Sequence, residues 1–226
     1  FDALVTLAAT LEVSLASLLA SYPDKEIEAT LAGMASLSRD AVAGPLVSSA
    51  LRGELDEARA AYTKLFDAGG ARASLYETEY GRMRGLSKGV VLADVSGFYA
   101  AFGLSLDADV AHEVVDHVAV ELEFYALLLL KEAALAAAKD DEGLAVVHDA
   151  RVKFLTDHLG RFGAAIASRP GVGESALYGP VFRFIARLVS EECEAAGARP
   201  APLDFFADRE ADEMKCGSVH LPVVPT

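Results

Sequence analysis

The chain has 226 residues, of which 53% are hydrophobic, and this is enough for one large domain with its own core. Its 34 acidic and 20 basic residues give a formal net charge of −14. Such a charge repels nucleic acid and anionic membrane surfaces, attracts basic peptides, and also keeps an apolar-rich protein soluble. The two cysteines, Cys193 and Cys216, match neither a disulfide framework nor a CxxC metal pair. We therefore predict a cytoplasmic protein without a nucleic-acid partner.

The N-terminal half predicts helices separated by turns. Leucines at three- and four-residue spacing predict a helix up to residue 20, and Asp24 is positioned to cap a second helix that ends near residue 37. A further apolar stripe predicts a helix over 55–65. The segment 71–89 contains three glycines and several basic residues, so we interpret it as a loop or hinge before a short helix over 92–102.

The C-terminal half predicts longer helices. A helical pattern covers 109–139, with Asp116 as a candidate break, and further helices are expected over 142–168 and 177–196. Four prolines after residue 199 predict an acidic, partly disordered tail over 200–226. Neither the segment 1–20, which has no basic residue, nor 118–138, which has four charged residues, fits a signal sequence or membrane span, so we predict no membrane insertion. The fold class is all-α, with about eight helices.

The most informative motif is DHVAVELEF at 116–124, where three carboxylates and a histidine precede an apolar run. Helical spacing places His117, Glu121 and Phe124 on one face. Two structural interpretations remain open: Asp116 caps a helix, or His117 and Glu121 form a hydrogen-bonded pair. The functional interpretation is an anionic patch that binds a cationic peptide through charge-assisted hydrogen bonds.

Metal chemistry is a weaker interpretation of the same region. Glu113, His117 and Glu121 follow one another at intervals of four, but the sequence lacks the paired Glu-x-x-His motifs of di-iron bundles. We predict no metal and no resident cofactor. An alternative function, a metal-dependent HD-type phosphohydrolase, would use His148 and Asp149 with an upstream histidine and a later aspartate, the candidates being His112, His117, Asp204 and Asp208.

Four segments resemble the TorD/DmsD/NarJ family of molybdoenzyme maturation chaperones. They are LYETEYG at 75–81, ADVSGFYAAFGL at 93–104, DHVAVELEF at 116–124 and FLTDHLGRF at 154–162, in the family's order. The third is the most specific, although Val115 stands where the family usually has a proline before Asp116. Without that proline the helix can continue unbroken through the motif.

The resemblance implies a helical fold of two lobes, which we place at 1–104 and 105–199 with a hinge at about 71–91. It also implies a non-enzymatic chaperone, a monomer or a domain-swapped homodimer. Such a chaperone binds the twin-arginine leader or the apo catalytic subunit of a molybdoenzyme, assists cofactor insertion and prevents premature export. Paired arginines followed by an apolar stretch would be complemented by an acidic rim beside an apolar groove. The predicted peptide-binding residues are Asp116, His117, Glu121, Glu123, Phe124, Phe98 and Tyr99.

Overall fold

The computed structural model describes residues 3–35, 37–38, 47, 55–67, 73–81, 84–104 and 114–203. Within these ranges the regular elements are helical, which confirms the predicted all-α class. The α-helices are α1 (Ala3–Ala20), α2 (Lys25–Ala35), α4 (Leu55–Tyr62), α5 (Arg84–Ala101), α6 (Val118–Ala138), α7 (Asp141–Asp157), α8 (Leu159–Ala167), α9 (Pro170–Gly173) and α10 (Tyr178–Ala196). A π-helical turn, η1 (Thr63–Asp67), extends α4, and a 3₁₀ turn, η2 (Glu77–Glu79), precedes α5.

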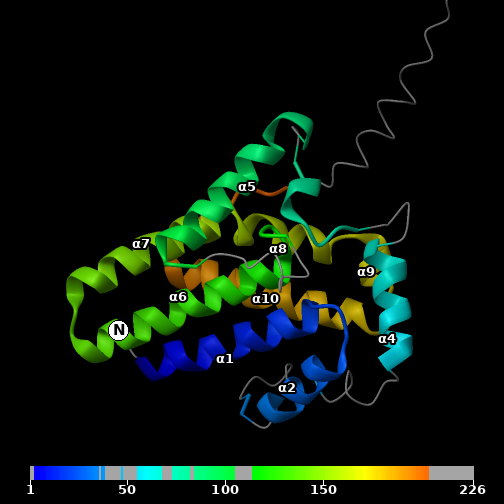
Figure 1. The fold of residues 1–226 in the computed structure, drawn as a ribbon, viewed down its shortest axis with the longest axis horizontal. Coiled ribbons are helices and arrows are strands. Elements are labelled where there is room, and N and C mark those ends of the chain that lie inside the picture. The colour runs from blue at the N-terminus through cyan, green and yellow to red at the C-terminus, as the bar shows by residue number, and fades with distance from the viewer. Residues whose placement is uncertain are drawn as a thin grey trace, which may run out of the picture.

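Helix α6 forms the centre of the structure (Figure 1). It packs along α1 on one side and along α7 on another, while α10 packs against α1, α7 and α8. A helix with apolar residues all round must be covered all round, and α6 buries Leu122, Phe124, Leu128 and Leu129 together with two carboxylates. The motif at 116–124 therefore lies at the start of a helix that is buried over much of its length. The predicted division into two lobes stays a prediction.

Helix α1 has the length and hydropathy of a membrane span, and it is the one such helix in the described part of the chain. The core helix of a folded protein passes the same test. Here α1 buries Val13, Leu15 and Leu19 and packs along α6, and the Ser17 hydroxyl donates a hydrogen bond of 2.8 Å to the carbonyl of Ala119.

The interpretation of 71–89 as a loop is wrong for its second half, because α5 begins at Arg84 rather than near residue 92. Each helical glycine lowers helix stability by about 1 kcal/mol, yet Gly89 lies in the helix interior. Helical hydrogen bonding continues through that position, so propensity was a weak guide here. The first half, 73–81, lacks an α-helix as expected, and it pairs with the turn before α6 through a bridge between Tyr76 and His117.

The single helix predicted over 142–168 is two helices. The backbone of His158 has φ −126° and ψ −101°, which ends α7 and starts α8 one residue later. A Cβ atom at Gly160 would lie 2.3 Å from the carbonyl oxygen of Leu155, so this close approach requires glycine. The apolar periodicity continues across the break, which is why the sequence pattern did not reveal it.

The first residues after α10 turn back across the bundle. The Arg161 guanidinium donates from Nε to the carbonyl of Ala201 at 3.3 Å. Leu203 reaches Gly81, whose positive φ of 91° favours glycine. The beginning of the predicted tail is thus placed against the segment that precedes α5, and the remainder, 204–226, lies outside the described residues.

Candidate peptide-binding site

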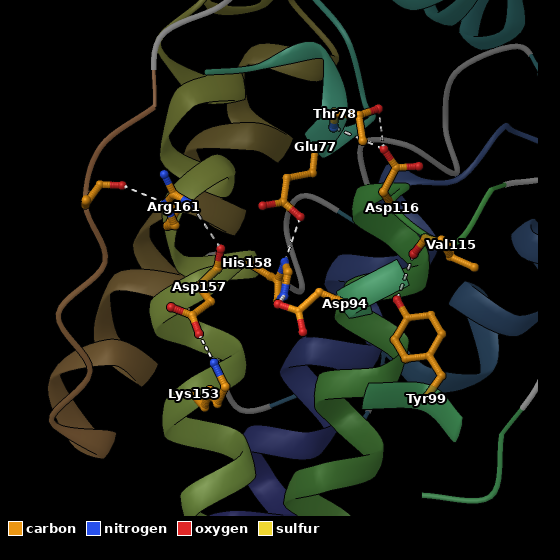
Figure 2. A network of polar contacts seen from close by, with 11 residues as sticks. Glu77, Thr78, Asp94, Tyr99, Val115, Asp116, Lys153, Asp157, His158 and Arg161 are labelled. Carbon is orange, nitrogen blue, oxygen red and sulfur yellow. Dashed lines mark hydrogen bonds and ion pairs between the residues drawn. The ribbon is translucent and has the colours of Figure 1, made fainter. Parts of the chain in front are cut away.

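Asp116 connects the turn at η2 to the start of α6 through hydrogen bonds. Its side chain is only 1% exposed, and its Oδ2 atom accepts hydrogen bonds from the backbone N–H of Thr78 at 3.1 Å and from the Thr78 hydroxyl at 2.7 Å (Figure 2). Its carbonyl oxygen accepts a further bond from the N–H of Glu77 at 3.0 Å. Asp116 is therefore a buried anchor between two segments, and it does not cap the helix.

His117 is the residue that caps α6. Its Nδ1 atom accepts from the N–H of Ala119 at 3.1 Å, and its Nε2 atom lies 3.3 Å from the hydroxyl of Tyr62. Burial lowers the pKa of His117 to about 4, against the opposing effect of the Asp116 charge. The ring is consequently neutral near pH 7, and because Nδ1 accepts, the proton lies on Nε2 and is donated to Tyr62. The cap formed by the His117 side chain thus fixes the start of α6 at Val118, although Val115 stands where the family usually has a proline.

Glu121 lies one turn into α6 and is completely buried. Neither of its carboxylate oxygens has a hydrogen-bond partner among the residues that the structure describes. The anticipated pair with His117 is not formed, since both ring nitrogens of His117 face other groups. Burial, followed by the negative charges of Glu77 and Asp116, raises the pKa of Glu121 well above its usual range.

A second polar cluster, which sequence reasoning did not assign, adjoins this acid. His158 approaches Glu77 Oε2 through Nδ1 at 2.9 Å and Asp94 Oδ2 through Nε2 at 3.3 Å (Figure 2). Glu77 and His158 are buried, whereas the Asp94 side chain is 53% exposed. These three residues fall in three of the four segments that resemble the chaperone family. The resemblance was therefore the one sequence signal that pointed to this cluster. Sequence alone does not bring them together, because they are up to 81 positions apart.

An apolar groove of about 430 Å³ lies among α1, the end of α5 and α6. Glu123 is exposed and is the charged residue in the described lining. Leu7 lies about one turn before Thr10 on α1, Leu4 lies about one turn before Leu7, and both leucines are exposed. The described lining comprises Thr10, Ser14, Tyr99, Leu104, Val120, Glu123, Phe124, Ala126, Leu127 and Leu130.

Three of the predicted site residues, Tyr99, Glu123 and Phe124, line this groove. Phe98 does not line it, and its ring packs edge-on against His158 and Phe154. The structure thus separates the predicted residues into a groove wall and a buried polar layer that contains Asp116, His117 and Glu121.

Tyr99 stands between these two parts. Its ring packs against Phe124 with centroids 4.7 Å apart, and its hydroxyl donates a 2.8 Å hydrogen bond to the carbonyl of Val115 (Figure 2). Burial, and then the charges of Glu121 and other acids, raises the pKa of Tyr99 far above its usual value. The same side chain therefore faces the groove and lies within electrostatic reach of the buried acids.

The phosphohydrolase alternative is not supported. His148 lies on α7 and faces Glu132 at 3.2 Å, and Asp149 is exposed. Glu132 is 15 positions beyond His117 on the same helix, a rise of about 22 Å, so one metal cannot bind both histidines. Within the described ranges, no three His, Cys, Asp or Glu side chains are placed to hold a metal ion. Glu113, His112, Asp204 and Asp208 lie outside those ranges.

Cys193 is not placed for nucleophilic chemistry. The thiol is buried on α10, and burial, together with the charges of Glu192 and Glu194, raises its pKa to about 11. A thiol with a raised pKa contains little thiolate at neutral pH, so Cys193 is a structural residue of the core.

The architecture is similar to that of a known protein. A solved structure from Archaeoglobus fulgidus, described as a redox enzyme maturation protein, superposes with a TM-score of 0.52 at 18% identity, covering 80% of this chain and 93% of that one. The two chains share a helical fold.

Sequence comparison then identifies the family. Residues 24–168 match the model of the nitrate reductase delta subunit family. The chain is 34% identical over 160 residues to the chlorate reductase assembly chaperone protein of Ideonella dechloratans, across 69% of this chain and 77% of that protein. The chain belongs to the nitrate reductase delta subunit family, and the predicted resemblance is confirmed.

Proposed function

We propose that this protein is an assembly chaperone of a molybdenum-containing oxidoreductase and that it binds the leader of the catalytic subunit in the groove among α1, α5 and α6. Family membership and the similarity to a chlorate reductase assembly chaperone support the role. The observation that carries the peptide site is the apolar groove with Glu123 at its rim.

The groove suits a segment that is apolar over several residues and cationic beside them. Burial of one leucine-sized side chain contributes about 1.5–3 kcal/mol, of which part is offset by the ordering of the peptide. The exposed carboxylate of Glu123 contributes less than about 1 kcal/mol to an ion pair. Apolar contacts therefore supply most of the affinity, while the net charge of −14 attracts basic leaders from a distance.

In this proposal Asp116 and His117 position the residues that line the groove. Asp116 holds the η2 turn on α6, and His117 caps α6 so that Val120, Glu123 and Phe124 are presented to the groove. We further propose that the chaperone works in the cytoplasm, as a monomer or swapped dimer, on the apo subunit before cofactor insertion and export. This work requires no catalytic step by the chaperone.

The first test is a calorimetric titration with a synthetic peptide that carries paired arginines followed by an apolar stretch. Leu130→Ser removes an apolar contact at the groove and should weaken binding roughly tenfold. Val146→Ser is the matched control, because Val146 is exposed on α7 and does not line the groove.

Equal affinity of the two variants would exclude the groove as the peptide site. Absence of binding by the unmodified protein would argue against leader recognition altogether. Affinity capture from native cells, with mass spectrometry of the bound proteins, then tests the wider role. Recovery of a molybdoenzyme subunit would identify the client.

A further inference from the structure

A second groove, of about 730 Å³, lies between α8 and α10, and we call it the α8–α10 groove. It shares no described lining residue with the groove among α1, α5 and α6. Its floor is apolar, because Ala165 of α8 and Val189 and Cys193 of α10 are buried there. A concave apolar surface of this size is typical of an interaction site, and the proposed function gives it no role.

The chain itself forms a third wall of the α8–α10 groove. Gly197, with a positive φ of 73°, ends α10, and Ala198 is buried directly after it. The Arg161 guanidinium then donates from Nε to the carbonyl of Ala201 at 3.3 Å (Figure 2), and Leu203 lines the groove. The segment after α10 is therefore already docked along α8, and the chain continues from the groove itself.

The charges at the α8–α10 groove are unusual for this chain. Arg161 and Arg199 line it, and Glu194 is the acid of its described lining, although the chain as a whole has a net charge of −14. The groove among α1, α5 and α6 has an acid, Glu123, and no basic residue in its described lining. A cationic peptide suits that groove, whereas an acidic segment with apolar residues suits the α8–α10 groove.

The sequence that follows Leu203 has this composition. Phe205 and Phe206 come within three residues of the groove, a span of about 11 Å at most. The stretch 204–213 also contains five acids and a single basic residue, Arg209. A tether this short gives a local concentration on the order of millimolar, so modest contacts suffice to hold the segment.

We propose that the α8–α10 groove binds the acidic segment 204–213 of this same chain. Phe205 and Phe206 cover the apolar floor, and the acids that follow lie beside Arg161 and Arg199. Because the two grooves share no described lining residue, binding of this segment does not depend on the leader.

A tryptophan reporter tests the proposal, because the sequence contains no tryptophan. In the folded Phe206→Trp protein we expect fluorescence emission at a shorter wavelength, and several-fold less quenching by acrylamide, than in the same protein unfolded in urea. Emission and quenching equal to those of the unfolded protein would show that position 206 is not covered, and the proposal would be overturned.

Ala164→Glu tests whether the groove is what covers the reporter. Ala164 is exposed on α8 and lines the groove, so a carboxylate there repels the acidic segment. In the Phe206→Trp protein this change should raise acrylamide quenching several-fold. Ala137→Glu is the matched control, because Ala137 is exposed on α6, away from the groove, and receives the same charge. Equal quenching after the two changes would overturn the groove as the binding place.

A second variant covers the case in which Ala164→Glu fails to fold, which circular dichroism would show. Arg199→Glu reverses an exposed charge after α10, and it should raise quenching by a smaller factor. Unchanged quenching would overturn the charge pairing on which the proposal is built. Binding within one chain is independent of protein concentration, so quenching that rises on dilution would place the segment in the groove of a second copy and overturn the proposal.

Discussion

The two ends of α6 contain buried carboxylates in opposite circumstances. Glu121 and Glu132 are 11 positions apart, so they lie on nearly the same face of the helix, and both are completely buried. Glu132 is 3.1 Å from Arg151 Nε and 3.2 Å from His148, whereas the groups that act on Glu121 are acids. One end has the composition of a structural core, and the other lacks a counter-charge.

The end at Glu132 is an ionic network among three helices, in which, among the described residues, Glu132 Oε2 and Arg151 Nε form no hydrogen bond although the two residues form an ion pair. Arg151 on α7 also approaches the Tyr125 hydroxyl and Glu192 Oε2 on α10, each at 3.3 Å, and Tyr125 donates to Glu192 at 2.7 Å. The network joins α6, α7 and α10, and Arg151 lies beside both of its carboxylates, Glu132 and Glu192. Glu121 and Glu132 are equally buried, so the counter-charge beside Glu132 is what distinguishes the two ends.

The largest expected effect is at the Glu132 end of α6. Arg151→Met leaves Glu132 buried without its cation, and we expect a loss of about 3–5 kcal/mol in the free energy of unfolding. Urea denaturation followed by circular dichroism measures it. A loss below about 1 kcal/mol would show that the network contributes little and would weaken the contrast between the two ends.

The end at Glu121 should respond to acid through His117. Its folded pKa of about 4 is below the unfolded value of 6.5, so the unfolded chain takes up the proton first and stability falls as pH falls below 6.5. Between pH 7 and pH 5 this amounts to roughly 2 kcal/mol. His117→Asn keeps a capping side chain that does not titrate, and it should lose correspondingly less stability over that interval. Parallel pH profiles for the two proteins would contradict the assignment.

The smallest expected effect has the opposite sign. Glu121→Met replaces an unpartnered acid by an apolar side chain of similar size, and we expect a gain of about 1 kcal/mol in stability. Because the folded pKa of Glu121 is raised, the unmodified protein loses stability as pH rises above about 4.5, and the advantage of the variant should grow with pH. Glu132→Met, the matched change at the other end, should destabilise. A destabilised Glu121→Met protein would mean that Glu121 has a stabilising partner in the free chain.

Some features of the fold follow from local sequence signals, whereas others depend on long-range contacts. The apolar stripes predicted α1 and α10, and Asp24 caps α2 as expected, with its Oδ1 atom accepting from the N–H of Ile27 at 2.8 Å. Helix α6 begins at Val118, next to the candidate break at Asp116, and the first part of the predicted helix, 109–113, lies outside the described residues. These features depend on residues that are only a few positions apart, so they can be predicted from the sequence.

The sequence by itself determined the helical class, the family and the motif on which the site is built. Only the tertiary structure decided which residues of that motif line the groove and which are buried in the core. Helical spacing shows which residues share a face of the helix, but it does not show what covers that face. The contacts of Glu77 with His158 and of Arg151 with Glu192 cross 81 and 41 positions. Such pairs form when packed helices bring them together, and no local pattern encodes them.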